Sequence, residues 1–327
     1  MHWIRGEELG RGGFAFVSKG VIQQEDSSCL VVAVKSSKSS ECKSLVKEKK
    51  LLDRFNNCPF IIRCFGDETS QEDGQELYNI FLEYASGGCL AGEINKSSNA
   101  GKGLPEPLVK KHTRSILVAL SHMHAMGYVH CDIKPHNILI VKEAGVEDTA
   151  KLADLGSALN MRGRGGEDED DDDGGFRGTV LYAAPESISN QTYVPQSDVW
   201  SLGCTVLSML TGNNSPWKFD KSCMNAVDVM MKIGCSDQIP EMPRKLISKE
   251  AMDFLKKCFV KDPTSRCTAH MLLDHPFIKA APLAGRCSSS RRRHHHHHHH
   301  HLASRLFHGI SSLVPTCFHL HHSAAVS

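Results

Sequence analysis

The segment GYVHCDIKPHNILI, residues 127–140, brings a carboxylate, an ammonium and an amide together at short spacing. They belong to Asp132, Lys134 and Asn137. Transfer of a phosphoryl group to a hydroxyl needs a carboxylate that orients the hydroxyl and accepts its proton, and Asp132 suits that task. Lys134 would offset the charge of the migrating group. The Asn137 amide oxygen would bind Mg²⁺, a hard cation that takes oxygen ligands.

Residues 9–17, LGRGGFAFV, place glycines between two segments of strand character. Glycine has no Cβ, so such a turn lets the backbone come close to negatively charged oxygens. A dinucleotide-binding loop would need a helix after its glycines, whereas FVSKGV reads as another strand. The pattern fits a flap over nucleotide phosphates. An ordinary glycine-rich hairpin is the alternative.

The next apolar run, LVVAVK, ends in a lysine that would meet those phosphates. The ammonium of Lys35 would reach the α- and β-phosphates of ATP if a carboxylate held it in place. Glu48 is the best candidate, because leucines lie three or four residues away on its helical face. Glu41, near the start of that helix, is the other candidate. Further along, Asp154 in KLADLG would bridge a metal ion to the β- and γ-phosphates.

The elements that carry these residues change character along the chain. The first part reads as strands with glycine turns, with one helix over residues 40–54 and apolar runs at 61–66 and 77–85. Helical spacing dominates the second part, at residues 104–127, 198–212, 251–260 and 269–278. We expect Gly127 to cap the first of these helices and Pro276 to end the last. A strand-rich part followed by a helical part predicts an α+β protein of two lobes.

Together these motifs resemble those of the protein kinase family, from about Trp3 to Ile278. Gly178-Thr179 and Ala184-Pro185-Glu186 match the end of the family's activation segment, which would cover residues 154–186. The lysine after the catalytic aspartate and the Gly-Thr pair imply serine/threonine specificity. The resemblance also implies the two-lobed kinase fold: a small β-rich N-lobe with one key helix, a larger helical C-lobe, and a disordered basic, histidine-rich tail. Their ranges would be 1–85, 86–282 and 283–327.

The resemblance assigns further roles to residues of this chain. Asp198 matches the buried aspartate that fixes the catalytic loop, and Arg266 matches the buried partner of Glu186. ATP and Mg²⁺ are the implied cofactors. The implied catalytic residues are Asp132, Lys134, Asn137, Lys35, Glu48 and Asp154, of which Asn137 and Asp154 would bind the metal. Leu82 would be the gatekeeper, and the Glu83 carbonyl and Ala85 amide would bind adenine. The implied nucleotide contacts are Leu9, Gly10, Arg11, Gly12, Gly13, Phe14, Ala15, Phe16, Val17, Ala33, Lys35, Leu82, Glu83, Ala85 and Leu139.

Three longer stretches are similar to plant MAP kinase kinase kinases of the MEKK-like class. They are MHWIRGEELGRGGFAFVSKG, FLEYASGGCLAGEI and KGLPEPLVKKHTRSILVALSHMHAMGYVHCDIKPHNILI. This resemblance implies a protein substrate, a MAP kinase kinase, in stress, hormone or defence signalling. Two alternatives remain open. One is a catalytically silent scaffold, although such proteins usually lack Lys35, Asp132 or Asp154. The other is a serine/threonine kinase that acts outside the MAP kinase cascade.

Cys131 stands where many kinases of this family have an arginine directly before the catalytic aspartate. In those kinases a phosphorylated activation-loop residue docks on the guanidinium. A thiol has no charge to neutralise, so we expect activity that does not depend on activation-loop phosphate. Ala15 replaces the third loop glycine and Leu155 replaces a phenylalanine, and neither change removes a catalytic atom. Leu155 would stack with His130 and Leu52.

Bulk properties exclude several classes of protein. A net charge of +1 over 327 residues gives no overall field toward nucleic acid or anionic lipid. No apolar run reaches the roughly 20 residues that span a bilayer. Thirteen scattered cysteines without a Cys-x-x-Cys pair indicate reduced thiols. We expect a cytoplasmic monomer that binds neither nucleic acid nor membrane, with Arg291–Arg293 as a short basic run that leaves nuclear import open.

Two segments have a strongly biased composition. EDEDDDD, residues 167–173, lies inside the expected activation segment and is expected to be a solvated loop. The alternative is that it attracts basic docking sequences of a substrate. The run His294–His301 is expected to be a repeat expansion in a disordered tail, since a metal site needs fixed geometry.

Overall fold

The protein is described by a computed structural model, in which residues 1–282 form one compact unit. The structure describes residues 2–279 except 14, 26–27, 100–101, 143–144, 146, 163–174 and 220–224. The acidic run and the predicted tail therefore lie outside the described residues, as does Phe14 of the glycine turn.

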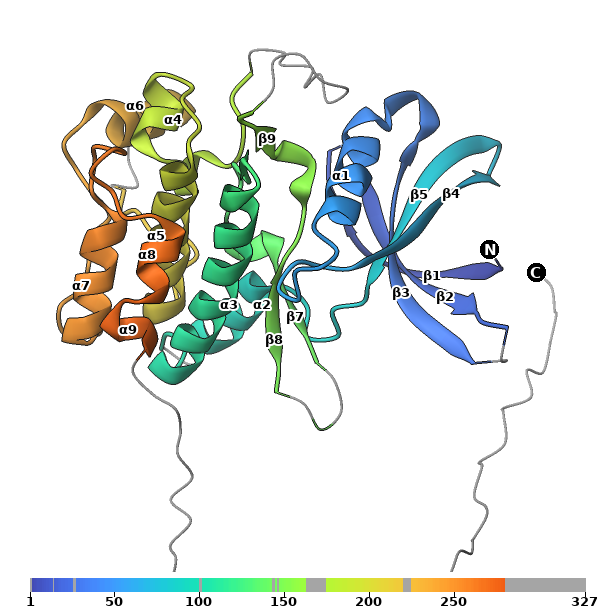
Figure 1. Ribbon diagram of the computed structural model, residues 1–327, viewed down its shortest axis with the longest axis horizontal. Helices are drawn as coiled ribbons and strands as arrows, with labels where there is room; N and C mark the ends of the chain where they lie inside the picture. The colour runs from blue at the N-terminus through green and yellow to red at the C-terminus, as the bar shows by residue number, and fades with distance from the viewer. Residues whose placement is uncertain are drawn as a thin grey trace, which may run out of the picture. The chain divides into compact units, whose positions relative to one another are not determined.

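Five antiparallel strands form the N-terminal sheet in the order β1-β2-β3-β5-β4 (Figure 1). They are β1 Trp3–Arg11, β2 Phe16–Gln23, β3 Cys29–Lys38, β4 Cys64–Glu72 and β5 Gln75–Glu83. Alternate residues of a strand face opposite sides of the sheet. Val32 and Val34 of β3 are therefore buried in one cluster with Phe81, while Lys35 faces the other side. This alternation directs the lysine toward α1 and the helical part.

Helix α1, Lys43–Arg54, packs beside this sheet (Figure 1). Its buried residues lie three or four positions apart and form one face, namely Leu45, Glu48, Leu51 and Leu52. The helix begins later than the predicted residue 40, because Ser39–Glu41 form a separate 3₁₀ turn, η1. Glu48 is therefore the one carboxylate among leucines on the buried face of α1.

The apolar run at residues 61–66 enters the sheet only from Cys64 onward. Ile61 forms an isolated bridge with Leu152 instead, and the N–H of Ile62 donates to the Leu152 carbonyl at 2.8 Å. Both isoleucines are buried. The run is apolar because it joins the sheet to the second part of the chain.

The second part of the chain is mainly helical (Figure 1). Its helices are α2 Leu90–Ser98, α3 Glu106–Ala125, α4 Pro185–Ser189, α5 Pro195–Thr211, α6 Ala226–Cys235, α7 Lys249–Cys258, α8 Ala269–Leu273 and α9 Pro276–Lys279. Helix α5 is buried all along residues 197–210, as its apolar sequence predicts. Gly127 follows α3 with a φ of 88°, and Gly212 ends α5 with a φ of 73°, a conformation that glycine adopts readily. The predicted α+β class is confirmed.

The predicted helix at residues 269–278 is wrong in one respect, since the segment forms two short helices. Helix α8 ends at Leu273, and Pro276 begins α9 rather than ending a helix. Proline suits the first turn of a helix because its missing N–H has no partner to lose there.

Two small two-stranded sheets contain or flank the motifs. Strand β6 Tyr128–Val129 pairs with β9 Leu159–Asn160, and β7 Ile138–Val141 pairs with β8 Thr149–Leu152. Residues 130–137 form the loop between β6 and β7, and Asp154 follows directly after β8. Short strands thus fix both ends of the predicted catalytic loop.

The cysteines within the described residues are free thiols. In the same part of the chain, no group of three His, Cys, Asp or Glu side chains could hold a metal ion. None of the helices described here is long and apolar enough to cross a membrane.

Candidate active site

The catalytic loop, residues 130–137, is fixed by a buried carboxylate from α5. Asp198 is 1% exposed and accepts the backbone N–H groups of His130 and Cys131 at 2.8 and 3.0 Å. The Nε2 atom of His124 in α3 lies 2.8 Å from the same carboxylate. Burial of a carboxylate is costly unless its oxygens are hydrogen-bonded, and these contacts satisfy both oxygens. Asp198 therefore holds the loop backbone in the way expected from the sequence.

A hydrogen-bonded group surrounds the carboxylate of Asp132. Lys134 Nζ donates to Asp132 Oδ2 at 2.7 Å and to Thr179 Oγ1 at 2.8 Å. The Thr179 hydroxyl donates to Asp132 Oδ1 at 2.8 Å, and Asn137 Nδ2 donates to Asp132 Oδ2 at 2.9 Å. Thr179 arrives from 47 positions along the chain. The carboxylate is held in one orientation by all three neighbours.

A second charged group joins β3, α1 and the segment after β8. Lys35 Nζ lies 2.6 Å from Glu48 Oε2 and 3.0 Å from Asp154 Oδ1. Burial alone lowers the pKa of Lys35, but the negative charges of Glu48 and Asp154 outweigh it and raise the pKa above its ordinary value. Lys35 therefore keeps its charge at neutral pH. Of its two candidate partners the structure selects Glu48, since Glu41 lies in η1 before the helix.

Asp154 has a backbone conformation that few residues other than glycine adopt. Its φ of 62° and ψ of 69° are left-handed, and Cys131 of the catalytic loop has a φ of 68°. Such strain persists where the surroundings enforce it, often at functional sites. Burial raises the pKa of Asp154, but Lys35 more than offsets this, so the pKa lies below its ordinary value. The side chain is 46% exposed, which leaves an ionised carboxylate accessible to a ligand.

Asn137 and Asp154 offer the oxygen donors that Mg²⁺ prefers. Asn137 directs its amide nitrogen to the backbone carbonyl and the carboxylate of Asp132, both at 2.9 Å. Its amide oxygen is the atom that remains for a ligand. The side chains of this structure therefore fit the metal that the sequence implies.

The glycine turn between β1 and β2 is closed by the N–H of Gly12, which donates to the Ala15 carbonyl at 2.8 Å. A side chain at Gly10 or Gly13 would meet no atom within 4 Å. Internal packing therefore does not require glycine at these positions, whereas close approach of a phosphate does. The predicted contacts on the flanking strands are Leu9, Gly10 and Arg11 at the end of β1, and Phe16 and Val17 at the start of β2.

The other predicted nucleotide contacts lie on β3, β5, β7 and the segment after β5. They are Ala33, Leu82, Glu83, Ala85 and Leu139. Ala33 pairs with Leu82 across β3 and β5. The carboxylate of Glu83, the last residue of β5, accepts two hydrogen bonds from Lys151 Nζ at 2.7 and 2.9 Å. This pair ties the end of the sheet to β8, and contact of these residues with adenine stays a prediction.

Glu186 and Arg266 form the predicted buried ion pair. Arg266 donates through Nη1 and Nη2 to the two carboxylate oxygens of Glu186 at 2.7 and 3.0 Å. The Ser197 hydroxyl also donates to Glu186, and Arg266 also donates to the carbonyls of Gln196 and Val260. A bidentate pair with its other groups satisfied keeps a fixed geometry. It ties the start of α4 to the segment before α8.

Cys131 contributes no charge to the site. Burial and the neighbouring charge of Asp198 raise the pKa of its thiol well above the ordinary value. Gly178 packs against the same loop with a φ of 95°, and a Cβ there would collide with the Cys131 carbonyl oxygen. The end of the activation segment therefore contacts the loop through the Gly178 backbone and the Thr179 hydroxyl, and not through a charged side chain at position 131.

Leu155 is fully buried in the same large core cluster as Leu52, and its stacking with Leu52 and His130 stays a prediction. His130 is also fully buried, and its Nε2 atom lies 3.2 Å from the Ala153 carbonyl. Helix α1 and the 3₁₀ turn Leu155–Ser157 (η3) are in contact. The segment after Asp154 is thereby packed against the helix that carries Glu48.

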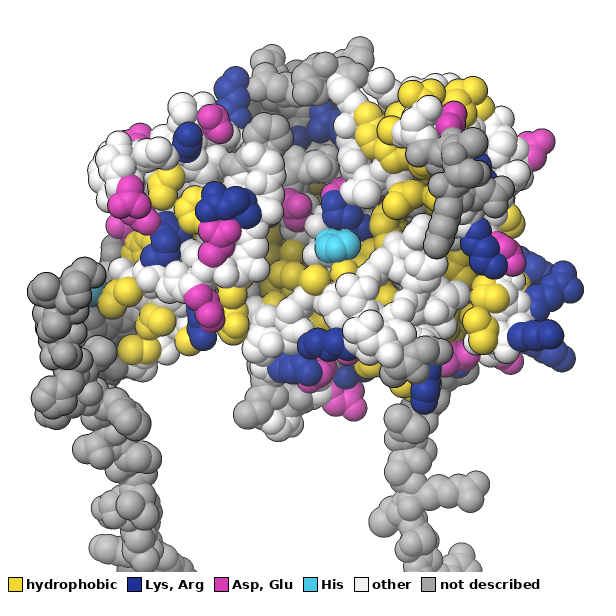
Figure 2. All heavy atoms as spheres, turned by 180° about the vertical axis from the view of Figure 1, so that it is seen from behind, with side chains coloured by type: hydrophobic (Ala, Val, Ile, Leu, Met, Phe, Trp, Pro, Cys, Tyr) yellow, Lys and Arg dark blue, Asp and Glu magenta, His cyan; other side chains and the backbone are white. Residues whose placement is uncertain are grey.

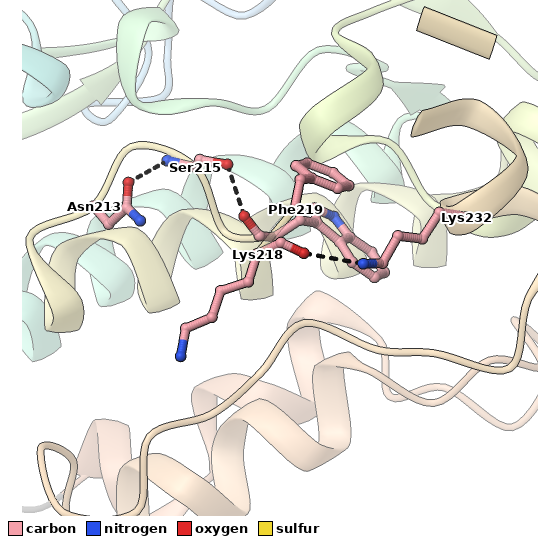
Figure 3. Close-up of a pocket in the computed structure, with 6 residues that line it drawn as sticks. Asn213, Ser215, Lys218, Phe219 and Lys232 are labelled. Carbon is pink, nitrogen blue, oxygen red and sulfur yellow. Dashed lines mark hydrogen bonds between the residues drawn. The ribbon is translucent and has the colours of Figure 1, made fainter. Parts of the chain in front are cut away.

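Acidic, basic and histidine side chains gather in a hollow near the middle of the face shown in Figure 2. A separate pocket of about 500 Å³ lies between the end of α5 and α6 (Figure 3). Its lining residues are Asn213, Ser215, Trp217, Lys218, Phe219 and Lys232. The Ser215 N–H donates to Asn213 at 3.0 Å, and Lys232 donates to the Lys218 carbonyl at 3.0 Å. The described residues that line this pocket include no carboxylate, which phosphoryl transfer needs.

Several contacts of the site have no signal in the sequence. The carboxylates of Asp198, Glu83 and Glu186 each have a partner from another segment of the chain. These partners are His124, Lys151 and Ser197, respectively. No local motif marks them. The sequence places Thr179 in the activation segment, but its bond to the catalytic carboxylate appears only in three dimensions.

Known proteins resemble this chain over most of its length. Residues 3–278 match the family model of the protein kinase domain. The chain is 42% identical over 284 residues to mitogen-activated protein kinase kinase kinase 20 of Arabidopsis thaliana, covering 85% of this chain and 78% of that protein. It is 36% identical over 283 residues to mitogen-activated protein kinase kinase kinase 17 of the same plant, covering 86% of this chain and 71% of that protein.

A third relative, mitogen-activated protein kinase kinase kinase 18 of Arabidopsis thaliana, is 35% identical over 284 residues, or 85% of this chain and 78% of that protein. The region matched by the family model contains every described residue of the site. This chain therefore belongs to the protein kinase family, and within it to the serine/threonine kinases of the MAP kinase kinase kinase group.

Proposed function

We propose that this kinase binds ATP with Mg²⁺ and transfers the γ-phosphoryl group to a serine or threonine hydroxyl of a MAP kinase kinase. Bound Mg²⁺ supplies positive charge that offsets the phosphates. Asn137 and Asp154 hold the metal through their side-chain oxygens. Lys35 binds the α- and β-phosphates, and its ion pair with Glu48 at 2.6 Å fixes where its ammonium points.

Asp132 orients the substrate hydroxyl and accepts its proton. Its two oxygens are already hydrogen-bonded to Thr179 and Lys134 at 2.8 and 2.7 Å, which limits rotation of the carboxylate. Lys134 carries the positive charge nearest to this oxygen and offsets charge on the migrating group. Preorganised charges of this kind lower the barrier without rearrangement during the reaction.

The observation that carries the proposal is the pairing of the two charged groups, Lys35 with Glu48 and Asp154, and Lys134 with Asp132. A silent scaffold usually lacks Lys35, Asp132 or Asp154, and here all three are present and hydrogen-bonded. Their hydrogen bonds favour an active enzyme.

The substrate class rests on the relatives. The three relatives described above are named as MAP kinase kinase kinases, and the chain covers 71–78% of their length. We extend to this chain the substrate that such a name implies, a MAP kinase kinase, and a role in stress, hormone or defence signalling in the cytoplasm. A serine/threonine kinase acting outside the cascade is the competing proposal.

The substrate is tested by incubating the purified kinase with a panel of MAP kinase kinases and labelled ATP, then mapping the phosphorylated residues. Asp132→Asn and Lys35→Met serve as inactive controls. We expect phosphate on activation-loop serine or threonine of one or a few panel members. Strong labelling of myelin basic protein with no labelling of the panel would support the competing proposal.

Cys131 gives a second, independent expectation. Since the thiol is uncharged, no cation at this position needs an activation-loop phosphate to neutralise it. Phosphatase-treated kinase should therefore retain most of its activity toward a protein substrate. Loss of nearly all activity after treatment, regained on rephosphorylation, would contradict this expectation.

A further inference from the structure

Arg5 lies at the centre of a polar cluster on the face of the N-terminal sheet opposite Lys35. Its Nε and Nη2 atoms donate to the two carboxylate oxygens of Glu72 at 2.7 and 2.8 Å. Nη1 donates to the hydroxyls of Ser18 and Ser36 at 2.7 and 3.0 Å, and Nη2 donates to the Asn79 amide oxygen at 2.8 Å. A guanidinium has five N–H donors in a rigid plane. All three of its nitrogens are bonded here, and the partners lie on β2, β3, β4 and β5, so its position is fixed.

Two aromatic rings flank this fixed guanidinium. Arg5 Cζ lies 4.9 Å from the centre of the Trp3 ring and 5.2 Å from the centre of the Phe16 ring. The Phe16 ring also contacts a second guanidinium, since Arg11 Cζ lies 5.0 Å from its centre. Arg11 forms an ion pair with Glu8 at 2.5 Å. Phe16 of β2 therefore lies close to two cations of β1: Arg5, fixed by its hydrogen bonds, and Arg11, beside the turn.

Phe16 and Arg11 are the residues that flank the glycine turn. Arg11 is the last residue of β1, Phe16 is the first residue of β2, and the two pair across the strands. The described residues of the turn have little packing of their own: a Cβ added at Gly13 would have no neighbour within 4 Å, and one added at Gly12 would meet the Ala15 carbonyl oxygen at 3.5 Å, within the turn itself. The position of the turn relative to the sheet therefore depends on its two flanking side chains.

We propose that Arg5 is a positioning residue for the glycine turn and acts through the Phe16 ring. The inference rests on the proposed binding of ATP, because the turn is assigned to the phosphates. Arg5 limits the motion of the turn before the nucleotide binds, so less freedom is lost when the backbone N–H groups meet the phosphates. Arg5 touches neither ATP nor the protein substrate.

Arg5→Met tests this role, since methionine keeps an aliphatic side chain and removes every donor and the charge. We expect KM for ATP to rise about fivefold while KM for the protein substrate stays the same. Ile22→Ala is the matched control. Ile22 is 6% exposed, belongs to the buried cluster on the same face, and pairs with Trp3 at the end of β2 away from the turn. The Ile22→Ala variant should have a lower Tm than the wild type and the same KM for ATP.

A double variant tests the route through Phe16. Phe16→Leu alone should raise KM for ATP, and adding Arg5→Met to it should raise KM by less than about twofold further, because contacting residues are not additive. If Arg5→Met does not fold, Glu72→Gln weakens the same anchor and should show the same change in KM for ATP alone.

An Arg5→Met enzyme that has a lower Tm but wild-type KM for ATP would overturn the inference. So would fully additive effects of Arg5→Met and Phe16→Leu. Neither result bears on the proposed function, which is tested on the wild-type kinase, by calorimetry with ATP and by phosphoryl transfer to the panel.

Discussion

The catalytic loop and the glycine turn serve the same proposed reaction, yet they are fixed by different means. The loop, residues 130–137, is fixed by Asp198 of α5. The side chain of Asp198 is 1% exposed and accepts hydrogen bonds from two backbone N–H groups of the loop. Among its described residues, the turn is attached to the sheet through Arg11 and Phe16, the two residues that flank it. Its outer pair, Arg11 with Glu8, is 64% and 45% exposed.

This difference follows from what each segment must do. A carboxylate that accepts a proton must stay within hydrogen-bond reach of one hydroxyl, so a buried anchor is suitable. A turn that covers phosphates must admit ATP and release ADP, so looser attachment is suitable. We therefore expect substitutions at the loop to act mainly on kcat and on stability, and those at the turn to act mainly on KM for ATP.

Asp198→Asn should have the largest effect. The asparagine amide has the shape of the aspartate carboxylate but not its negative charge, which His124 and two backbone N–H groups contact in the wild type. We therefore expect the free energy of unfolding to fall by about 2–3 kcal/mol. Displacement of Asp132 should lower kcat about 100-fold. Denaturant unfolding and steady-state kinetics measure both. Ser201→Ala, one turn along α5, is the control, and a kcat for Asp198→Asn close to that of the control would mean that Asp198 does not position the loop.

Gly178→Ala should have the second largest effect. Its φ of 95° is strained for alanine, and the added Cβ would collide with the Cys131 carbonyl oxygen. We expect a loss of about 1–3 kcal/mol in the free energy of unfolding. A drop in kcat should accompany it, with KM for ATP unchanged. A rise in KM for ATP alone would show that the two segments are not separately fixed.

The contributions of Asp154 and Lys35 to stability should show little pH dependence near neutrality. The pKa of Asp154 is below its ordinary 3.8, so its contribution to stability is complete above that value and is lost as the pH falls through the lowered pKa. The pKa of Lys35 is above its ordinary 10.5, so its contribution is complete below that value and is lost only at higher pH.

The stability difference between the wild type and Asp154→Asn should therefore be constant from about pH 5 to pH 9 and shrink at more acidic pH. Urea unfolding at a series of pH values measures it. A difference that changes steeply between about pH 6 and pH 8 would mean that another titrating group controls the site.

Gly13→Ala should have the smallest effect on stability. The added Cβ would meet no atom within 4 Å, so the free energy of unfolding should change by less than about 0.5 kcal/mol. KM for ATP should still rise, because the methyl group stands where a phosphate approaches. An unchanged KM for ATP would remove the glycine turn from the nucleotide site.

Sequence patterns predicted the structure well where one periodicity, or a short spacing between residues, determines it. The alternation in β3 indicates the direction of Lys35, and the leucine spacing of α1 favours Glu48 over Glu41 as its partner, a choice that the structure settles. The sequence does not indicate that His124 binds Asp198, because the two residues lie 74 positions apart and only packing of α3 against α5 joins them. Arg5 was missed for the same reason, since its partner Glu72 is 67 positions away.

The boundaries and the number of helices and strands were also predicted poorly from the sequence. The run at 61–66 is as apolar as a strand, but its first residues bridge to Leu152 rather than to the sheet. Helices α2, α4 and α6 were not predicted. Length alone is not the reason, because α7 also has ten residues and was predicted; its buried residues lie three or four positions apart, whereas in α6 only Ile233 is buried.

The assignment of Asp132 as proton acceptor is tested by comparing the wild type with Asp132→Asn at saturating ATP and Mg²⁺. Calorimetry measures nucleotide binding, and single-turnover transfer of labelled phosphate measures the chemical step. We predict unchanged binding of ATP and transfer slower by about a thousandfold, because only the proton acceptor is lost. Equal transfer rates for the two proteins, or no transfer by the wild type despite bound ATP, would contradict this assignment.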